Sequence, residues 1–480
     1  MNRIVTGLMI TLGTLICGCA VGPDYQSSEF GWNAPALAQS GEHFTEVAPD
    51  PRWWQSWDDE ILETLIARGV RYNRDLRIAW ANLNEARALR GLRQLDQLPT
   101  VTSQGSYQNS KTSENAFPTG IPIDTSQNDF FSLGFDATWE LDLFGRVRRQ
   151  VESAAAQSEA AVAAYADVMI TTVSEIAREY TELRGLDDRL EIARRNVAIR
   201  QETLTVAENR MLAGIGEEFD VVRARSNLTL VEAVIPELQG EQQASLNRLS
   251  VLTGAMPGEI SDLLEQRQGQ ITVPAEIAVG LSSNLLKRRP DIRQAEQLLA
   301  AATADVGVAT ADFFPRFIFT GEVKVDSLEI GSLLSSGSSA WSFGPGFSWA
   351  FLDLGRVIQR KRAADARLDR SIASYEQAVL VALEEAFSAL ARLEAEKQRS
   401  AKLAESVTSS RKALELAQIR YQEGLDDILS VLDVERQLLV AEEQFSLSRT
   451  RQGTRLIALY KTLGGLNLDE LKTESLYTAN

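Results

Sequence analysis

Few side chains in this sequence could perform chemistry at a site. His43 is the only histidine among 480 residues, which leaves no histidine-based catalytic triad and no ordinary zinc site. Gly214 and Gly216 lack a later glycine at the spacing of a dinucleotide-binding loop, and they follow a helical pattern rather than a strand. Acidic pairs such as residues 384–385 lie in helical stretches, where solvated carboxylates are the ordinary explanation. We therefore expect no enzyme, no resident cofactor and no metal site.

The residue best suited to a covalent modification is Cys19. Arg3 and the apolar residues 4–16 are typical of a secretory signal that is too short to span a bilayer as an ordinary helix. Cys19 follows the small residue Gly18, as the lipid-receiving cysteine of a bacterial lipoprotein does, whereas Cys17 follows a bulky residue. We expect Cys19 to carry N-acyl and diacylglycerol lipid; the alternative is ordinary signal cleavage that leaves a free thiol.

The charge of the chain restricts its partners. The formal net charge is -17, and no run of five or more Lys or Arg residues occurs. Phosphate backbones bind basic surfaces, so we expect no nucleic-acid partner.

The positions of these residues depend on a sequence that repeats itself. Trp, Leu, Gly, Arg and Val at residues 139–147 return about 210 residues later at 349–357, and residues 75–105 match 291–321. Two copies of a long module indicate duplication. The predicted parts are a signal peptide (1–18), a lipidated tether (19–57), a first repeat with a helix, two strands and a long helix hairpin (58–270), a second repeat (271–465) and a C-terminal equatorial tail (466–480).

Each repeat contains two predicted strands. Apolar and polar residues alternate over residues 131–139, 317–325 and 341–351, and more weakly over 101–109, with aromatic residues at many apolar positions. About ten residues is the length that a tilted strand needs to cross a bilayer. Four strands cannot close a barrel, and an open edge in lipid is costly, so we expect three chains to form twelve strands. The alternative is a soluble sheet with one buried face.

A long helix follows the second strand of each repeat. Heptad spacing over roughly 68 residues corresponds to a helix about 100 Å long. Asp167 interrupts its most apolar stretch, which favours a packed coiled coil over a membrane-spanning helix. Glycines at 213–218 and 423–427 predict hairpin tips, after which returning helices run to about residues 253 and 464.

Three motifs carry a family resemblance. Val-Gly-Pro-Asp-Tyr follows Cys19 at residues 21–25, Arg-Arg-Pro-Asp-Ile occupies 288–292, and Leu432-Asp433 follows a glycine tip. The chain resembles the TolC-like outer-membrane factors, closest to their OprM- and NodT-type lipoprotein branch. The resemblance implies an α+β membrane protein: a homotrimer with a twelve-stranded transmembrane β-barrel, four strands per chain, continued by a long α-helical coiled-coil barrel in the periplasm and built on an internal two-fold repeat.

The resemblance also implies a function. It indicates the outer-membrane exit duct of a tripartite, RND-type multidrug efflux system, a passive channel opened by a periplasmic adaptor and an inner-membrane pump. The protein would be anchored in the outer membrane by its lipid and extend into the periplasm. A channel for type I protein secretion is the alternative, and a structural lipoprotein between outer membrane and cell wall is a third possibility. The lipidated N-terminus favours efflux.

Site residues follow from the same resemblance. It implies a pore gate formed by Asp433, Asp220 and Tyr421, and adaptor-docking tips at Gly214, Ile215, Gly424 and Leu425. Three symmetry-related Asp433 carboxylates would form a ring that attracts cations, although a solvated helix carboxylate is the alternative. Asp220 could instead cap its helix. We expect Tyr421 to tie its tip to the neighbouring helix pair through a hydroxyl hydrogen bond. Ser430 and Asp426 depart from the TolC pattern.

Overall fold

The computed structural model describes residues 20–26, 44–47, 50–111, 113, 127–265, 276–280 and 288–464. Cys19, the predicted signal peptide and the predicted C-terminal tail lie outside these residues. The principal elements are η2 (Trp53–Trp57), α2 (Glu60–Tyr72), α3 (Arg74–Leu95), β2 (Thr100–Lys111), β3 (Gln127–Leu141), α4 (Arg146–Leu212), α5 (Glu218–Glu232), α6 (Val234–Leu252), α7 (Ser261–Glu265), α9 (Pro290–Ala311), β5 (Arg316–Ser327), β6 (Ser339–Ser348), α10 (Leu354–Gln422) and α11 (Ile428–Thr462). Two short strands, β1 (Phe44–Thr45) and β4 (Ile277–Ala278), pair in parallel.

Contacts divide the chain into two compact units, and each unit takes segments from both predicted repeats. The first contains residues 1–29, 83–161 and 295–375, and the second contains residues 30–82, 162–294 and 376–480. The first unit therefore holds the larger sheet, and the second holds the helix hairpins. Each is described by itself.

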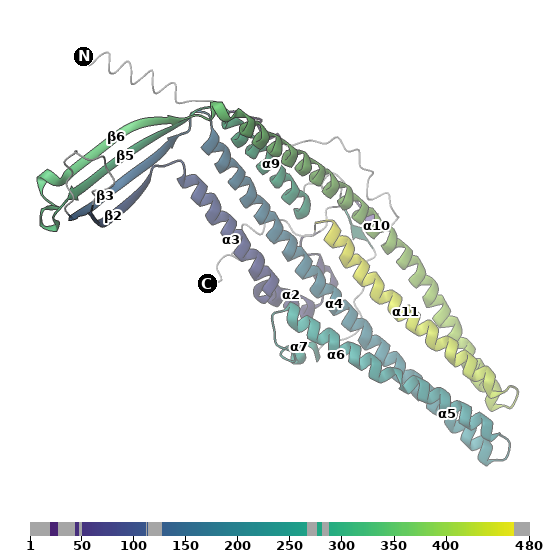
Figure 1. Cartoon of the computed structure of the whole chain (residues 1–480). Helices are drawn as coiled ribbons and strands as arrows, with labels where there is room; N and C mark the ends of the chain where they lie inside the picture. Colours follow the sequence, from purple (N-terminus) through teal and green to yellow (C-terminus); the bar gives the residue numbers. More distant parts are fainter. Residues whose placement is uncertain are drawn as a thin grey trace. The chain divides into compact units, whose positions relative to one another are not determined.

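The sheet of the first unit has four strands at the predicted places, but β6 ends at Ser348 rather than at residue 351, where a short 3-10 helix (Phe351–Asp353) begins. The strands are antiparallel in the order β2-β3-β5-β6 (Figure 1). Phe135 pairs with Val323, which in turn pairs with Trp341, so these apolar side chains share one face. Phe135 is 61% exposed and Trp341 is 73% exposed. One face of the sheet is therefore apolar, aromatic and uncovered within the chain.

The opposite face of the sheet is polar. Asp136 accepts hydrogen bonds from Thr102 (2.7 Å) and Gln104 (2.9 Å) on the neighbouring strand. Ser132 donates to Asp326 (2.7 Å), and Lys324 forms an ion pair with the same carboxylate (3.5 Å). The alternation of apolar and polar residues in the sequence thus gives the sheet one face suited to contact with lipid and one face suited to contact with water.

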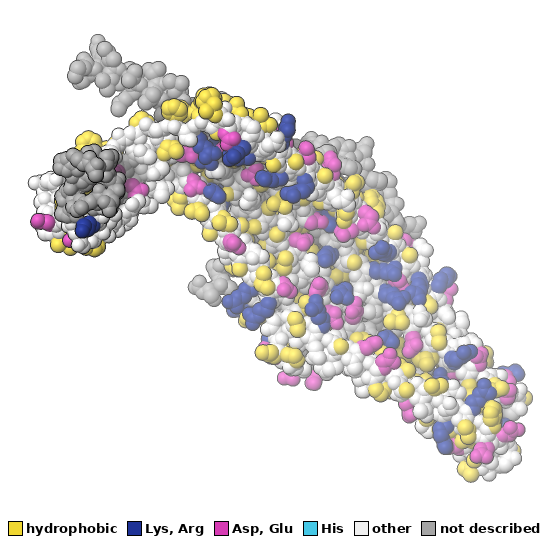
Figure 2. Space-filling view, in the orientation of Figure 1, with side chains coloured by type: hydrophobic (Ala, Val, Ile, Leu, Met, Phe, Trp, Pro, Cys, Tyr) yellow, Lys and Arg dark blue, Asp and Glu magenta, His cyan; other side chains and the backbone are white. Residues whose placement is uncertain are grey.

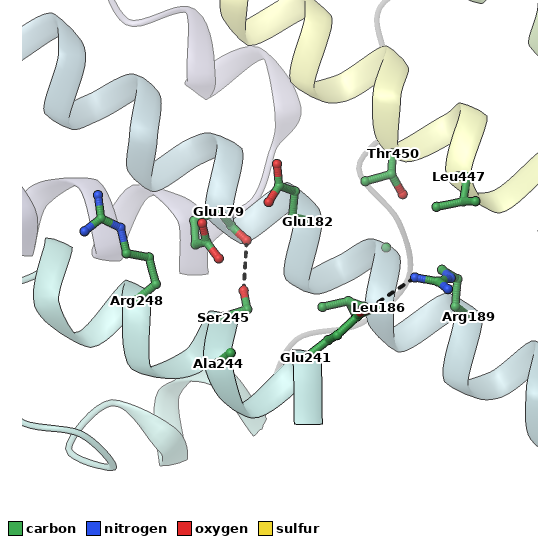
Figure 3. A pocket seen from close by; sticks show the side chains of 11 residues that line it. Glu179, Glu182, Leu186, Arg189, Glu241, Ala244, Ser245, Arg248, Leu447 and Thr450 are labelled. Carbon is green, nitrogen blue, oxygen red and sulfur yellow. Dashed lines mark hydrogen bonds and ion pairs between the residues drawn. The ribbon is translucent and has the colours of Figure 1, made fainter. Parts of the chain in front are cut away.

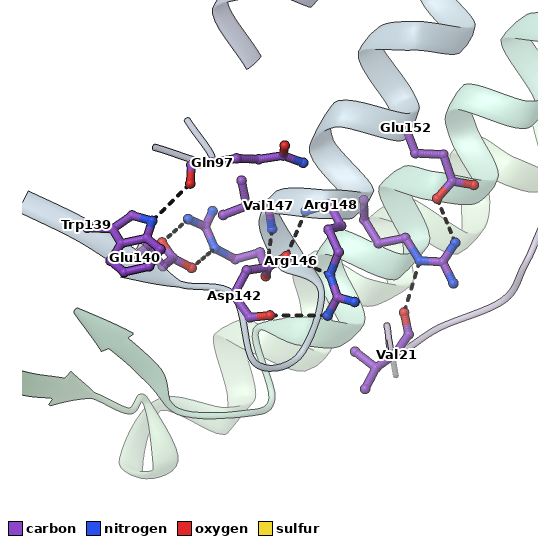
Figure 4. A network of polar contacts seen from close by, with 10 residues as sticks. Val21, Gln97, Trp139, Glu140, Asp142, Arg146, Val147, Arg148 and Glu152 are labelled. Carbon is purple, nitrogen blue, oxygen red and sulfur yellow. Dashed lines mark hydrogen bonds and ion pairs between the residues drawn. The ribbon is translucent and has the colours of Figure 1, made fainter. Parts of the chain in front are cut away.

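A short turn connects β3 to α4. Asp142 caps the helix, because its carboxylate accepts hydrogen bonds from the backbone N–H groups of Val147 (3.0 Å) and Arg148 (2.9 Å) (Figure 4). Just before it, the indole of Trp139 donates to the carbonyl of Gln97 (3.0 Å). Its counterpart Trp349 donates to the carbonyl of Phe313, also at 3.0 Å. The repeated tryptophan therefore makes the same contact in both copies.

Helix α9 packs between two long helices of the first unit. Ala300 and Ala301 form a buried cluster with Ala156 of α4. One turn further on, Val306 and Ala309 pack with Ala364 of α10. Small side chains on both faces allow α9 to approach each neighbour closely.

Helix α3 occupies the matching place in the first half of the sequence, but an apolar row on it stays uncovered. Leu89, Leu92 and Leu95 are 53%, 55% and 61% exposed. They recur every third residue and therefore lie along one side of the helix. Nothing in the described chain covers this row.

Two hairpins of helices dominate the second unit. Helices α4 and α10 contain 67 and 69 residues, close to the predicted length. In Figure 1, α11 returns beside α10 and α5 beside α4, and a buried apolar cluster includes residues from all four helices. Helix α4 also contains an 18-residue window apolar enough to cross a membrane by length and composition, but 56% of that window is buried inside the structure.

The returning helix of the first hairpin reaches its predicted end, but it is not continuous. The helix is interrupted between Glu232 and Val234, where α5 ends and α6 begins. Pro236 explains the break, because its ring clashes with the carbonyl four residues earlier and it has no N–H to donate. The residue at the matching offset in the second copy is Ser446, and α11 runs through it without interruption.

Candidate functional site

The two hairpin tips end their first helices by the same backbone arrangement. Gly214 and Gly424 both have φ of 72°, in the left-handed region. The N–H of Ile215 donates to the carbonyl of Arg210 (3.1 Å), and that of Leu425 donates to the carbonyl of Arg420 (2.8 Å). Six-to-one bonds of this kind, following a left-handed glycine, define a Schellman motif. The glycines thus stop both helices at the predicted places.

Apolar side chains project from the tips. Ile215 is 66% exposed and Leu425 is 68% exposed. The first tip adds Leu212 and Phe219, which are 80% and 63% exposed. Both predicted docking positions therefore offer apolar surface to a partner, and the first tip offers more.

Tyr421 connects the second tip to the first helix pair. Tyr421 is 5% exposed, and the Arg210 guanidinium lies 4.8 Å from the centroid of its ring. Arg210 also donates to the Tyr421 carbonyl (3.0 Å). The expected hydroxyl hydrogen bond is not what makes this contact, because the Tyr421 hydroxyl has no such bond with any residue that the structure describes. Arg210, which the sequence alone did not identify as a site residue, supplies both interactions.

Asp220 lies near this contact but is not joined to it directly. It is in the first turn of α5, where a carboxylate interacts favourably with the helix dipole. The preceding Glu217 holds the N-cap position. Burial raises the pKa of Tyr421, the negative charge of Asp220 raises it further, and Arg210 opposes both effects. Asp220 therefore acts on Tyr421 through its field.

Asp433 is half exposed and paired along its own helix. Its carboxylate accepts from Arg436 (2.8 Å) and from Gln437 (2.6 Å). The side chains of Asp433 and Arg436 are 50% and 72% exposed, so water screens the pair. Any ring built from Asp433 would thus contain an equal number of nearby guanidinium groups.

Asp426 organises the second tip. It accepts from the hydroxyl of Ser430 (2.9 Å) and from Arg420 (3.3 Å), and it lies next to Asp427, which caps α11. The hydrogen bond from Ser430, the N–H of Asp427 and the Arg420 guanidinium hold the pKa of Asp426 below its usual range. The two departures from the TolC pattern are therefore bonded to each other.

The segment that follows Cys19 is part of the first unit and packs against the start of α4. The N–H of Val21 donates to the carbonyl of Phe144 (3.1 Å). Arg149, which is almost fully buried, donates to the Val21 carbonyl (3.3 Å) and to Asp24 (2.6 Å), as Figure 4 shows for the carbonyl contact. Cys19 itself is outside the described residues. The next residue, Ala20, lies close to Gly145: a Cβ atom on Gly145 would lie 2.6 Å from Ala20.

Arg289 of the Arg-Arg-Pro-Asp-Ile motif joins three helices of the second unit. It donates to Asp291 at the start of α9 (3.0 Å), to Glu385 of α10 (2.7 Å) and to the Thr462 carbonyl at the end of α11 (3.1 Å). A cavity of about 620 Å³ lies beside it. Burial and the nearby Asp291 raise the pKa of Asp167, which lines the same cavity. The motif thus fixes a helix junction.

A second cavity, of about 500 Å³, lies where α4, α6 and α11 meet. Arg189 pairs with Glu241 (3.5 Å), and Ser245 donates to the Glu179 carbonyl (3.5 Å) across it (Figure 3). Only these two contacts join polar lining residues to each other, and the Nε of Arg189 is buried without a hydrogen-bond partner among the described residues. Within the described ranges, no group of three or more His, Cys, Asp or Glu residues could hold a metal ion.

The outer surface offers no basic patch on the side that Figure 2 shows. Lys and Arg side chains are interspersed with Asp and Glu over the described helical surface on that side. Interspersed charge of this kind suits a solvated exterior more than a phosphate-binding face.

Comparisons with known proteins agree with this architecture. A family described as "Outer membrane efflux protein" matches residues 68–255 and 281–465, one match in each predicted repeat. The solvent efflux pump outer membrane protein SrpC of Pseudomonas putida is 30% identical over 458 residues, covering 94% of this chain and 96% of that protein. The cation efflux system protein CusC of Escherichia coli O157:H7 is 28% identical and also covers 94% of this chain and 96% of its own length.

Solved structures give the same answer. The outer-membrane channel OprN superposes with a TM-score of 0.86 and is 38% identical, covering 93% of this chain and 99% of that chain. Sequence and fold therefore agree over nearly the whole length of the protein. The chain belongs to the outer membrane efflux protein family and is an efflux channel of the outer membrane.

Proposed function

We propose that the protein is the passive exit duct of a tripartite, RND-type multidrug efflux system, opened by a periplasmic adaptor and an inner-membrane pump. The observation that carries the proposal is a sheet with one exposed aromatic face and one hydrogen-bonded polar face, in a chain whose long helices end in apolar tips. Relatives named as efflux pump outer membrane proteins support it. The chain supplies a path and no catalytic step.

The sheet supports a homotrimer. Its edge strands, β2 and β6, each pair on one side only within the described chain. An unpaired edge in hydrocarbon costs several kcal/mol for each backbone group, so β6 of one chain must pair with β2 of the next. Three chains with four strands each close a barrel of twelve, with the aromatic face toward lipid and the polar face toward the lumen.

The helices of the first unit support the same assembly. Helix α9 is covered by α4 on one side and by α10 on the other. The internal repeat makes α3 the counterpart of α9, so α3 should also lie between two long helices. Because its own chain leaves Leu89, Leu92 and Leu95 exposed, α10 of the neighbouring protomer is the expected cover. Six helix pairs then complete a periplasmic barrel.

The tips are the proposed working end. Gly214, Ile215, Gly424 and Leu425 form the adaptor-docking surface, since Gly-bounded hairpins with exposed apolar residues present ready contact area. Asp433, Asp220 and Tyr421 form the proposed gate. Removing the contacts that hold α10 against α4 should open it.

The lipid anchor and the cargo complete the proposal. We assign N-acyl and diacylglycerol lipid to Cys19, and the packed segment from Ala20 to Tyr25 would hold this anchor at the base of the sheet. Relatives are named for solvent efflux and for cation efflux, so the fold does not select the cargo and the partner pump must. The lipid anchor favours efflux over the alternative of type I protein secretion.

Leu92→Glu tests the assembly. Burying a charge in the α3 contact should convert the detergent-extracted trimer to smaller species in sedimentation, and drug susceptibility of the cells should rise. Leu328→Glu is the matched control, because this leucine is 61% exposed in the β5–β6 connection and should be tolerated. A wild-type chain that sediments as a monomer and conducts no ions in planar bilayers would overturn the proposal.

A further inference from the structure

A buried polar layer interrupts the apolar packing of α4 against α11 close to the tips. Glu435 of α11 is 1% exposed, and Arg200 and Thr203 of α4 are 4% and 5% exposed. Residues of the surrounding cluster, such as Leu204 and Leu438, are apolar. The Thr203 hydroxyl donates to one oxygen of the Glu435 carboxyl group. Polar residues in a coiled-coil core lower its stability, which makes this layer a weak point of the interface.

The layer is also incompletely paired. The second oxygen of Glu435 and the Nε of Arg200 are buried, and neither has a hydrogen-bond partner among the described residues. Buried polar atoms without partners are costly, and separation of the helices would expose these two atoms to water. The packed arrangement therefore contains a local driving force for its own opening.

The next polar layer along α11 is different. Glu442, seven residues later, accepts from Arg411 of α10 (2.7 Å) and from Asn196 of α4 (3.3 Å). Each of its oxygens has a partner. Glu442 thus serves as a control within the same helix: it is a buried glutamate whose two carboxylate oxygens are both hydrogen-bonded in the packed form.

Still further from the tips, a glycine backbone on each of α4 and α11 contacts a threonine side chain of the other helix. A Cβ on Gly185 would lie 2.2 Å from the Thr450 hydroxyl, and a Cβ on Gly453 would lie 2.7 Å from Thr181. The two helices are therefore closely packed here, whereas the Glu435 layer, nearer the tips, is incompletely paired. We expect separation to begin on the tip side, where the Glu435 layer lies.

We propose that Glu435 positions the gate: its buried, half-paired carboxyl group sets the balance between packed and separated α4 and α11 at the tips, and its protonation favours the packed form. The inference rests on the proposed channel function, which it deepens by assigning a response to acid. Arg200 on α4 is the charged residue that acts on Glu435. The cluster members from α5 and α10, Leu228 and Leu414, bring no charge.

The direction of the response follows from the packing. Burial raises the pKa of Glu435, while the Thr203 hydrogen bond and the charge of Arg200 oppose this effect. In the separated form the carboxyl group meets water, and its pKa returns toward the ordinary value of about 4.3. The stabilisation of the packed form by protonation is therefore fully present below about pH 4.3, and it is lost as the pH rises through the raised pKa of Glu435 in the packed form. Acid should tighten the tips.

Glu435→Gln tests the proposal on the full-length trimer in detergent. Amide hydrogen exchange of the peptide 431–438, corrected for the intrinsic rate, is followed from about pH 4 to 8. Wild type should lose protection as pH rises, and Glu435→Gln, which stays neutral, should lose this dependence. Glu442→Gln should keep the wild-type pH curve. Planar-bilayer conductance should show the same pattern. The conductance of wild type and of Glu442→Gln should fall in acid, and that of Glu435→Gln should not.

A second variant guards against misfolding of the first. Arg200→Met with Glu435→Leu removes both buried polar side chains, and its peptide 431–438 should be protected at every pH. The inference is wrong if Glu435→Gln, or this double variant, retains the wild-type pH curve, or if wild type shows none. Hydrogen exchange can be measured whether or not the protein conducts ions. If the exchange pattern is as expected but no conductance is found, the proposed channel function is wrong and the role of Glu435 stands.

Discussion

Replacing Arg210 by Gln should loosen the contact between the two hairpins. The guanidinium makes a ring contact with Tyr421 at 4.8 Å and donates to its carbonyl at 3.0 Å. A cation–π contact is worth about 0.5–1 kcal/mol at an exposed site, and a hydrogen bond from a charged group about 1.5–3 kcal/mol. Arg210 is half-buried, so we take the lower ends and expect a loss of about 2 kcal/mol in each protomer. That is roughly a 30-fold shift toward the separated form.

The effect should appear at the membrane and in cells. Three protomers acting together would lose about 6 kcal/mol, so single channels of Arg210→Gln should be open far more often in planar bilayers. Cells carrying the variant should become sensitive to vancomycin, which is too large for the closed tip. Sedimentation must show that the trimer is intact.

Two controls separate the interactions. Arg210→Lys keeps the charge but not the planar group, and should lose only part of the effect. Tyr421→Phe keeps the ring and the carbonyl and should behave as wild type, because the hydroxyl bonds to no described residue. If Tyr421→Phe opens the channel and Arg210→Gln does not, the contact is held by the hydroxyl and our reasoning is wrong.

Three further predictions address the tips, the charge ring and the anchor. Gly214→Val and Gly424→Val should each destabilise the tip by about 1–2 kcal/mol through backbone strain alone, since each site has φ of 72° and open space for a Cβ. Drug susceptibility should rise with the trimer intact. Asn tolerates this backbone region, so Gly→Asn at either position should have a mild effect. Asp433→Asn should reduce cation selectivity in a salt gradient and Arg436→Gln should increase it, so unchanged reversal potentials would place the pair outside the pore. Mass spectrometry of the mature protein should find a lipid on Cys19 at its first residue, and a different mature terminus with a free Cys19 thiol would exclude the anchor.

Local physical chemistry explains which features the sequence determined. Strand alternation, helix length and the stops at Gly214 and Gly424 depend on residues close in sequence, whose periodicity and backbone preferences can be read directly. The pairing of Asp433 with Arg436 is a contact of the same kind, three residues apart on one helix. The break caused by Pro236 was equally local and could have been predicted.

The contacts that define the candidate site depend on tertiary structure. Arg210 meets Tyr421 across 211 residues, and Thr203 meets Glu435 across 232. Helical periodicity indicates that Glu435 lies on a core face, but it does not indicate which residue of α4 faces it, because that is decided by the relative register of two long helices. The register depends on close contacts such as Gly185 with Thr450, where small side chains let the backbones approach. Sequence therefore determined the elements and their ends, while packing between distant segments decided which polar groups are paired and which are left buried without a partner.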